Sequence, residues 1–357
     1  MTMSHFIYPF SFDDDTPNKI QGSLELSEPL PYQNQTGGGF FRTGRLQVNE
    51  IPPLEIVFYH NAATAQFIYM RDSILDANLM EIIGLDQGSV YRSGRQKLPG
   101  QLCLGADRVN LIGLAIQNIF SAPPLASTVP QYGQHNLAVF PIAREGLKYQ
   151  VAEAIYSNYG YFCDEVVLDA HHVFDSSVPV YNRTVELTLF KDKDLDHAQK
   201  ENIAVAFLAD SIASGLVMKE VILRVSERFE NLKQIEVISP LSTVRGLCRI
   251  AQSEAIVHTP VRIHIFETLL NALPPDYYYS AHFQDPRFHI CPELEQEYRA
   301  WWGKDAQGNV IADTACAGYG WSEVFYSPRK QIQMMNSQLS ARHDLTIAEI
   351  VKRNLQS

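Results

Sequence analysis

The sequence predicts an α/β protein with a mostly parallel sheet flanked by helices. Between residues 136 and 266, short apolar runs alternate with stretches of helical periodicity, which is typical of consecutive βαβ units. Several of these runs end in small or polar residues, as strands do where they turn into a helix. The chain has 357 residues, 46% hydrophobic and 19% charged, so it is long enough for one large or two modest domains.

The part of the chain before residue 136 is less regular. Residues 1–55 are rich in Pro, Gly, Asn, Gln and Asp and predict an irregular or short-strand extension rather than a core element. Leu54–Tyr59 predicts a strand. Apolar residues at near-helical spacing predict helices over Phe67–Ile83 and Leu111–Phe120.

The alternating part follows from residue 137. The predicted elements are, in chain order, a strand at 137–140, a helix at 147–156, a strand at 165–168, a β arm or hairpin at 184–190, a strand at 203–208, a helix at 215–229, a strand at 235–238, a helix at 242–251 and a strand at 261–266. Beyond Pro274 the sequence is loop-like and aromatic, and it ends in a helix over Ile347–Leu355. Thr346 and Glu349 have the spacing of a capping box at the start of that helix.

These patterns divide the chain into three predicted parts. They are an N-terminal extension (residues 1–60), a central α/β domain (61–290) and a C-terminal aromatic and helical extension (291–357).

Composition excludes some classes of function. A net charge of −11 argues against nucleic-acid binding, which needs a basic surface. No apolar stretch approaches the ~20 residues of a membrane span, and the start of the chain lacks the pattern of a signal peptide. Five scattered cysteines without a CxxC pair indicate reduced thiols, so we expect a cytoplasmic protein.

The most informative stretch is Asn202–Glu220, NIAVAFLADSIASGLVMKE. An apolar strand runs into a turn of small residues, and a helix follows. Backbone N–H groups of such a turn, together with the helix dipole, favour a bound phosphate. The alternative is an ordinary β–α turn in which Ser214 caps the helix.

Two segments resemble a known family. Val139–Leu147, VFPIAREGL, is similar to the V-x-P-I-L-R-A-G-L segment of uracil phosphoribosyltransferases, and Asp210–Gly215 resembles the 5-phosphoribosyl-1-diphosphate (PRPP) loop of type I phosphoribosyltransferases. His258–Ile263 and Met70–Asp72 are similar to two further segments of that family. The resemblance covers residues 67–287 and implies a phosphoribosyltransferase-like sheet.

The resemblance also implies an activity, in which a phosphoribosyl group passes from PRPP to a uracil-like nitrogenous acceptor and diphosphate leaves. Arg144 and Asp210 are the implied catalytic residues, and Asp210 with Glu145 would hold Mg²⁺. The implied substrate- and phosphate-binding residues are Gly146, Ser211, Ala213, Ser214, Gly215, Asp285 and Arg287. Asp285 and Arg287 belong to one candidate for the loop that would recognise the acceptor. Residues 313–320 are a second candidate for that loop. We expect a small-molecule diphosphate as the partner and a homodimer as the assembly.

Three departures from the family pattern leave alternatives open. Ala209 replaces an acidic residue, Leu216 replaces a glycine and Val217 replaces a hydroxyl donor. A non-catalytic regulator that senses a nucleotide is one alternative. A transferase acting on another diphosphate, such as a prenyl diphosphate, is the other.

Weaker patterns have simpler explanations. Asp169, His171 and His172 lack helical metal-ligand spacing and indicate a polar loop rather than a metal site. Tyr277–Tyr279 and Trp301–Trp302 would wall a ligand pocket or, more commonly, pack a subdomain.

Overall fold

The computed structural model describes residues 6–13, 19–85, 94–174, 183–188, 201–257, 259–270, 288–315 and 326–356. The strands are β1 (Phe6–Asp13), β2 (Lys19–Leu26), β3 (Leu30–Asn34), β4 (Gly37–Val48), β5 (Leu54–His60), β6 (Met70–Leu75), β7 (Gly94–Pro99), β8 (Leu137–Ala143), β9 (Asp164–Glu165), β10 (Leu168–Phe174), β11 (Arg183–Thr188), β12 (Val205–Ala209), β13 (Gln234–Ile238), β14 (Val261–Phe266), β15 (Thr268–Leu269) and β16 (Phe288–His289). The α-helices are α1 (Ala62–Ile68), α2 (Ala77–Ile83), α3 (Gly105–Ile119), α4 (Pro123–Tyr132), α5 (Val151–Tyr159), α7 (Leu216–Arg228), α8 (Val244–Val257), α9 (Pro292–Trp302), α10 (Ala312–Ala315), α12 (Pro328–His343) and α13 (Ile347–Gln356).

A single large sheet forms the centre of the molecule, with the strand order β1-β2-β4-β5-β14-β13-β12-β8-β10-β11. Strands β5, β14, β13, β12, β8 and β10 run parallel, and antiparallel strands continue the sheet at both ends. The predicted α/β class, with a mostly parallel sheet flanked by helices, is therefore confirmed.

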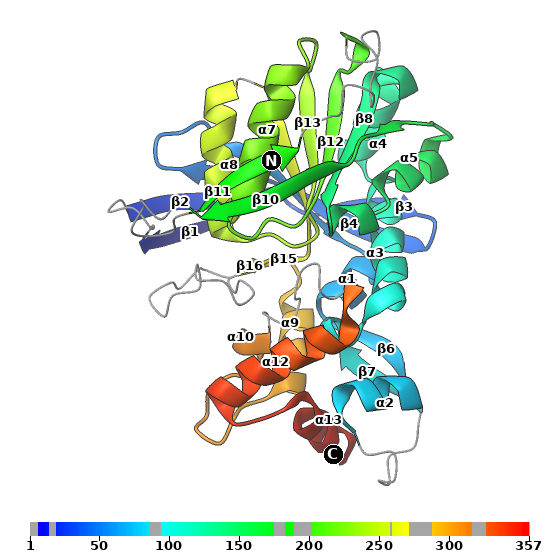
Figure 1. The fold of residues 1–357 in the computed structure, drawn as a ribbon, viewed down its shortest axis with the longest axis vertical. Helices are drawn as coiled ribbons and strands as arrows, with labels where there is room; N and C mark the ends of the chain where they lie inside the picture. Colours follow the sequence, from blue (N-terminus) through cyan, green and yellow to red (C-terminus); the bar gives the residue numbers. More distant parts are fainter. Residues whose placement is uncertain are drawn as a thin grey trace.

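Helices cover both faces of this sheet, with α7 and α8 on one side and α3, α4 and α5 on the other (Figure 1). The alternation of side chains along the strands explains the two layers. Phe207 of β12 packs against Phe120 at the end of α3, with ring centroids 5.8 Å apart. On the opposite face, Phe140 of β8 packs against Phe229 at the end of α7, with centroids 5.6 Å apart.

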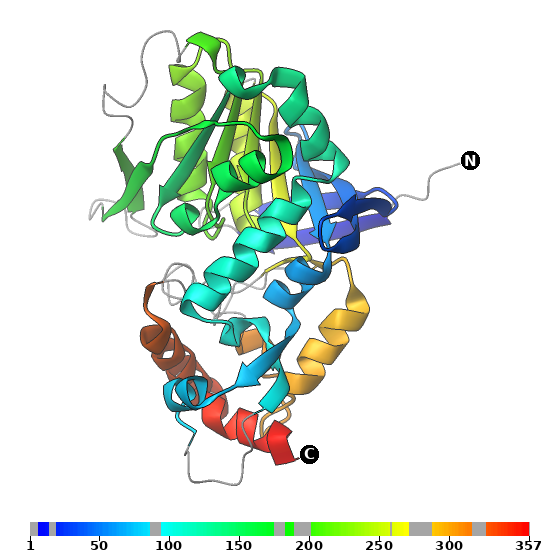
Figure 2. The same ribbon diagram turned by 90° about the vertical axis from the view of Figure 1, so that its right-hand side faces the viewer.

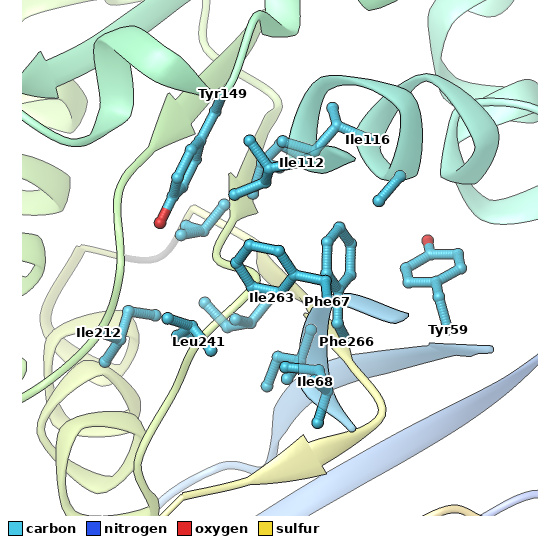
Figure 3. Close-up of a cluster of buried hydrophobic side chains, with 14 of the residues drawn as sticks. Tyr59, Phe67, Ile68, Ile112, Ile116, Tyr149, Ile212, Leu241, Ile263 and Phe266 are labelled. Carbon is cyan, nitrogen blue, oxygen red and sulfur yellow. The ribbon is translucent and has the colours of Figure 1, made fainter. Parts of the chain in front are cut away.

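Apolar side chains also fill the space where α1 and α3 meet the ends of β5 and β14. Figure 3 shows Phe67 and Ile68 of α1 among Ile112, Ile116 and Phe266. All five are at most 2% exposed. This cluster therefore packs α1 and α3 against the carboxyl ends of the parallel strands.

The N-terminal segment was predicted as an irregular or short-strand extension outside the core, but its strands belong to the large sheet and contribute buried side chains. Its strands β1, β2, β3 and β4 form an antiparallel continuation of the sheet that begins at β5. Leu24, Leu26, Leu46 and Val48 are at most 1% exposed. Their alternation with polar residues is the pattern of a strand with one buried face, and the Gly- and Pro-rich composition obscured it.

Two other sequence predictions are wrong. Phe67–Ile83 is not one helix but the end of α1, strand β6 and helix α2, because the spacing of so few apolar residues fits a strand as well as a helix. The region beyond Pro274 is also less loop-like than predicted, since Trp301 and Trp302 lie on α9. The capping box at Thr346 and Glu349 is confirmed by hydrogen bonds in both directions.

The elements α2, β6, β7, α9, α10, α12 and α13 form a second lobe below the sheet, and α3 runs between the two lobes (Figures 1 and 2). Contacts within this lobe join residues that are far apart in sequence. Arg329 of α12 donates to Glu81 of α2 at 2.9 Å, and Tyr69 contacts His289 at 3.0 Å.

The contact of Arg329 with Glu81 crosses the predicted domain boundary at residue 290, and the pairing of β5 with β14 crosses the boundary at residue 60. Strand β5, within the predicted extension, belongs to the parallel sheet, whereas β6 and α2 pack with the C-terminal helices α9 and α12. The three-part division stays a prediction.

In the described part of the chain, no helix taken alone has the length and apolar character to cross a membrane. Among the described helices, α3 and α4 reach that length and apolar character only when taken together, and the chain bends by 75° between them.

A buried polar network joins three strands of the sheet to α4. The Glu236 carboxylate of β13 accepts from Arg262 at 3.1 Å and from Thr128 at 3.2 Å, and it contacts His264 Nε2 at 2.8 Å. Nδ1 of His264 contacts the Tyr59 hydroxyl at 2.7 Å. Burial lowers the pKa of His264, so its imidazole is neutral and Arg262 supplies the positive charge that balances Glu236.

We expect Glu236→Ala to lower the free energy of unfolding by about 3–5 kcal/mol, because Arg262 would lose its buried counter-charge. Glu55→Ala is a matched control, because Glu55 binds the same arginine but its side chain is 59% exposed. This variant should lower the free energy of unfolding by less than about 1 kcal/mol. Chemical denaturation measures both values. Equal losses would contradict the role of the buried carboxylate.

Candidate functional site

A cavity of about 330 Å³ lies at the carboxyl ends of β8 and β12. Two turns line most of it, and Ala170, Val217 and Met218 complete the wall. The first turn follows β8 and contributes residues 142–145, and the second follows β12 and contributes residues 210–215.

The pairing of the two strands explains why these turns meet. β8 and β12 are parallel neighbours, with Phe140 opposite Leu208 and Pro141 opposite Ala209. Parallel strands in register end at the same edge of a sheet, about 4.8 Å apart, and open α/β sheets bind ligands at that edge. The structure therefore brings together Arg144 and Asp210, which are 66 positions apart in the sequence.

Helix α8 holds the second turn in place. The Thr243 hydroxyl donates to the carbonyl of Ala213 at 2.5 Å, and Arg249 donates to the carbonyl of Ser214 at 2.6 Å. Two carbonyl oxygens that would repel an anion are thus engaged by α8.

The turn ends at the start of α7. Gly215 has φ +77°, which favours glycine, and a Cβ there would lie 2.5 Å from the carbonyl oxygen of Gly246. The hydroxyl of Ser214 accepts from the amide of Leu216 at 3.4 Å. Because α7 has 13 residues and starts at the cavity, its dipole favours an anion there.

Gly146 has a packing role beside the cavity rather than in its wall. A Cβ at this position would collide with the carbonyl oxygen of Ala209. The glycine predicted to bind phosphate therefore allows the first turn to approach the end of β12 closely.

Glu145 lies in a buried hydrogen-bond network that links the two turns. It is 4% exposed, and its Oε1 accepts from the hydroxyls of Tyr149 and Ser211, each at 2.6 Å. The two hydroxyls are also 2.5 Å from each other. The Ser211 side chain is thus held by Glu145 and Tyr149.

The electrostatics of the cavity centre on two carboxyl groups. Burial raises the pKa of Glu145, and the hydrogen bonds from Ser211 and Tyr149 oppose that rise. Burial and the neighbouring Glu145 carboxylate raise the pKa of Asp210 well above its usual range. Because the Glu145 charge disfavours ionisation of Asp210, the pair favours a protonated Asp210 or a bound cation.

A C-terminal residue contacts the first turn. The Tyr326 hydroxyl donates to the carbonyl of Arg144 at 2.6 Å. The Tyr326 ring lies 5.8 Å from the Arg144 guanidinium and 4.9 Å from the Lys148 ammonium. Two cations of the first turn are therefore placed beside one aromatic face.

Some predicted site residues cannot be placed. Asp285, Arg287, His258 and most of residues 313–320 lie outside the described part of the chain, as do Tyr277–Tyr279. His171 is on strand β10 and not on a loop, where it forms an exposed ion pair with Asp169 at 2.8 Å. Trp302 is fully buried and packs the second lobe.

The three residues that depart from the family pattern, Ala209, Leu216 and Val217, differ in burial and in whether they line the cavity. Ala209 is completely buried as the last residue of β12. Leu216 opens α7, and Val217 lines the cavity.

Tyr149 and Tyr326 were not predicted as site residues from the sequence. Tyr149 is four residues after Glu145, a spacing that hinted at their contact. Tyr326 is 182 positions from its partner Arg144, and nothing in the local sequence connects them.

No protein-family model matches the sequence, and no curated protein matches it. Among solved structures, the chain is similar to adenine phosphoribosyltransferase from Trypanosoma brucei, solved in complex with AMP, pyrophosphate and ribose-5-phosphate. The TM-score is 0.34 with 10% sequence identity, over 68% of this chain and 95% of that chain. The interpretation of the cavity therefore depends on its own geometry.

The raised pKa of Asp210 makes a prediction about stability. Because the folded protein holds this proton more tightly than the unfolded chain, stability falls as pH rises from about 4, the usual carboxyl value, toward the raised pKa. We expect Asp210→Asn to reduce this decline, so that the variant gains in Tm relative to the wild type as pH increases. Thermal melts between about pH 4 and pH 8 measure the difference.

Asp169→Asn is the control, since the Asp169 side chain is 50% exposed. A Tm difference between Asp210→Asn and the wild type that does not change with pH would contradict the assignment.

Proposed function

We propose that the protein is a phosphoribosyltransferase-like enzyme that binds PRPP in the cavity between the two turns. One observation carries the proposal. The Arg144 turn and the Asp210–Gly215 turn, which separately resemble the diphosphate and phosphate segments of that family, line the same cavity at the carboxyl ends of adjacent parallel strands.

The two turns supply complementary groups for a phosphorylated sugar. The start of α7, with the Ser214 hydroxyl and the amides of Ala213 and Gly215, would hold the 5′-phosphate. The Ser211 hydroxyl donates to Glu145 and lies 2.5 Å from the Tyr149 hydroxyl, so it would fix the shape of the turn around the ligand. Asp210 would accept from the ribose hydroxyls.

Arg144 would act on the leaving group. When the bond between ribose C1 and the diphosphate oxygen breaks, negative charge grows on the diphosphate and positive charge on the ribosyl group. The Arg144 guanidinium would stabilise the former by charge-assisted hydrogen bonds. The catalytic effect of the protein would then be leaving-group stabilisation and positioning of the acceptor nitrogen.

The carboxyl groups of Glu145 and Asp210 fit the requirements of Mg²⁺. This ion prefers oxygen ligands and commonly uses one or two carboxylates together with substrate phosphates. Burial raises the pKa of both groups, and the Glu145 carboxylate further raises that of Asp210; a bound cation would offset the cost of keeping them ionised. Bound there, Mg²⁺ would neutralise the diphosphate.

The acceptor is proposed to be a uracil-like nitrogenous base, from the sequence resemblance alone. The cytoplasmic location and the homodimer stay predictions. Val217 in the cavity wall favours the second candidate function, a transferase that acts on a less polar diphosphate such as a prenyl diphosphate.

Calorimetry of the full chain against PRPP with Mg²⁺ tests the proposal. We expect the wild type to bind, and Arg144→Ala to weaken binding about 10- to 150-fold, the equivalent of about 1.5–3 kcal/mol for a hydrogen bond to a charged group. Arg224→Ala is the matched control, since Arg224 pairs with Glu220 and Glu227 on the exposed face of α7. It should bind PRPP as the wild type does.

Parallel titrations separate the alternatives. Binding of a prenyl diphosphate without binding of PRPP would favour the second candidate. Binding of a nucleoside monophosphate alone would favour a regulator without catalysis. Equal binding of PRPP by wild type and Arg144→Ala would contradict the role of the first turn.

A further inference from the structure

Three potential metal ligands converge at a different place on the same edge of the sheet. His60 is the last residue of β5, Glu267 directly follows β14, and Cys291 precedes α9. Nδ1 of His60, a carboxylate oxygen of Glu267 and Sγ of Cys291 all lie within 4.8 Å of one another. We propose that these side chains bind one divalent cation of the zinc class.

The distances within the group suit a shared ion. Nδ1 of His60 lies 3.0 Å from the Glu267 carboxylate and 3.2 Å from Sγ of Cys291. In a tetrahedral zinc site, bond lengths of about 2.0 Å to nitrogen and oxygen and about 2.3 Å to sulfur put the corresponding donors about 3.3 Å and 3.5 Å apart. The His60–Glu267 and His60–Cys291 donor pairs therefore need to separate by only a few tenths of an ångström.

The same geometry argues against a catalytic thiol. In a Cys–His–Glu relay, one ring nitrogen takes the thiol proton while the carboxylate orients the ring through the other nitrogen. Here Glu267 and Cys291 both contact Nδ1 of His60. A single nitrogen cannot serve both partners of a relay, whereas three donors that face one point form a coordination site.

The donor set selects the kind of cation. A thiolate, an imidazole and a carboxylate together are typical ligands of zinc and disfavour Mg²⁺ or Ca²⁺, which prefer oxygen. Three protein ligands leave a fourth position open. The His60 side chain is 25% exposed, so water can reach the site from that side.

Surrounding contacts hold the ligands in place. The Thr64 hydroxyl donates to Glu267 at 2.6 Å, which orients the carboxylate as outer partners of metal ligands do. The Phe40 ring stacks on His60 with centroids 4.7 Å apart. Strand β15 pairs with β16, and the Ile290 amide donates a hydrogen bond to the Glu267 carbonyl at 2.9 Å. These contacts place Cys291 beside Glu267.

The cluster is separate from the cavity at β8 and β12. In the strand order β5-β14-β13-β12-β8, the two sites are about three strand spacings apart, roughly 14 Å. An ion held by Cys291, at the start of α9, would connect the second lobe directly to the carboxyl ends of β5 and β14.

Cobalt titration of the chelator-treated full chain, followed by zinc displacement, tests this site. We expect one equivalent of metal per chain, a near-ultraviolet thiolate-to-cobalt band, and loss of both on addition of excess zinc. Cys291→Ser should abolish the near-ultraviolet band. Glu267→Gln should weaken the affinity at least about 10-fold, the smallest effect usual for perturbing such a site.

Cys163→Ser and His171→Gln are the matched controls, since both residues lie away from the cluster, and each should bind cobalt as the wild type does. Circular dichroism checks that the variants fold, and His60→Gln provides a second ligand variant should Cys291→Ser be misfolded. Absence of a stoichiometric cobalt band in the wild type, or an unchanged band in folded ligand variants, would overturn the proposal.

Discussion

The parallel pairing of β8 with β12 is the constraint on which the candidate site depends. It places the ends of two strands side by side, so the turns that follow them share one cavity. A shift of one residue would exchange the faces of each strand and would turn Phe140 and Phe207 away from the helices that they contact. Packing on both faces of the sheet thus sets the register that aligns the two turns.

The site uses tight contacts at its base and polar contacts in its interior. The close approach of Gly146 to the end of β12 and of Gly215 to α8 leaves no room for side chains between the turns. Glu145, Tyr149 and Ser211 then connect the turns by hydrogen bonds. The cost of burying Glu145 is offset because its oxygen receives two hydroxyl donors.

Particular residues show how far prediction from the sequence reached. Strands β8 and β12 were found because strands buried on both faces are continuously apolar. Strands β13 and β14 were found because apolar residues predominate in them despite Glu236, Arg262 and His264. The division of Phe67–Ile83 into two helices and a strand was missed, since local periodicity is ambiguous over short segments. The contact of Tyr326 with Arg144 was also missed, because it depends on how the C-terminal segment returns to the sheet.

The sequence by itself determined most of the order of strands and helices between residues 137 and 266, the two turns rich in small residues and the ionisable groups that they carry. These are local properties, set by periodicity and by the steric freedom of glycine. Only the tertiary structure decided that Arg144 and Asp210 face one cavity and that His60, Glu267 and Cys291 meet at one point. Such contacts arise from strand order and lobe packing, which depend on burial across the whole chain and not on neighbouring residues.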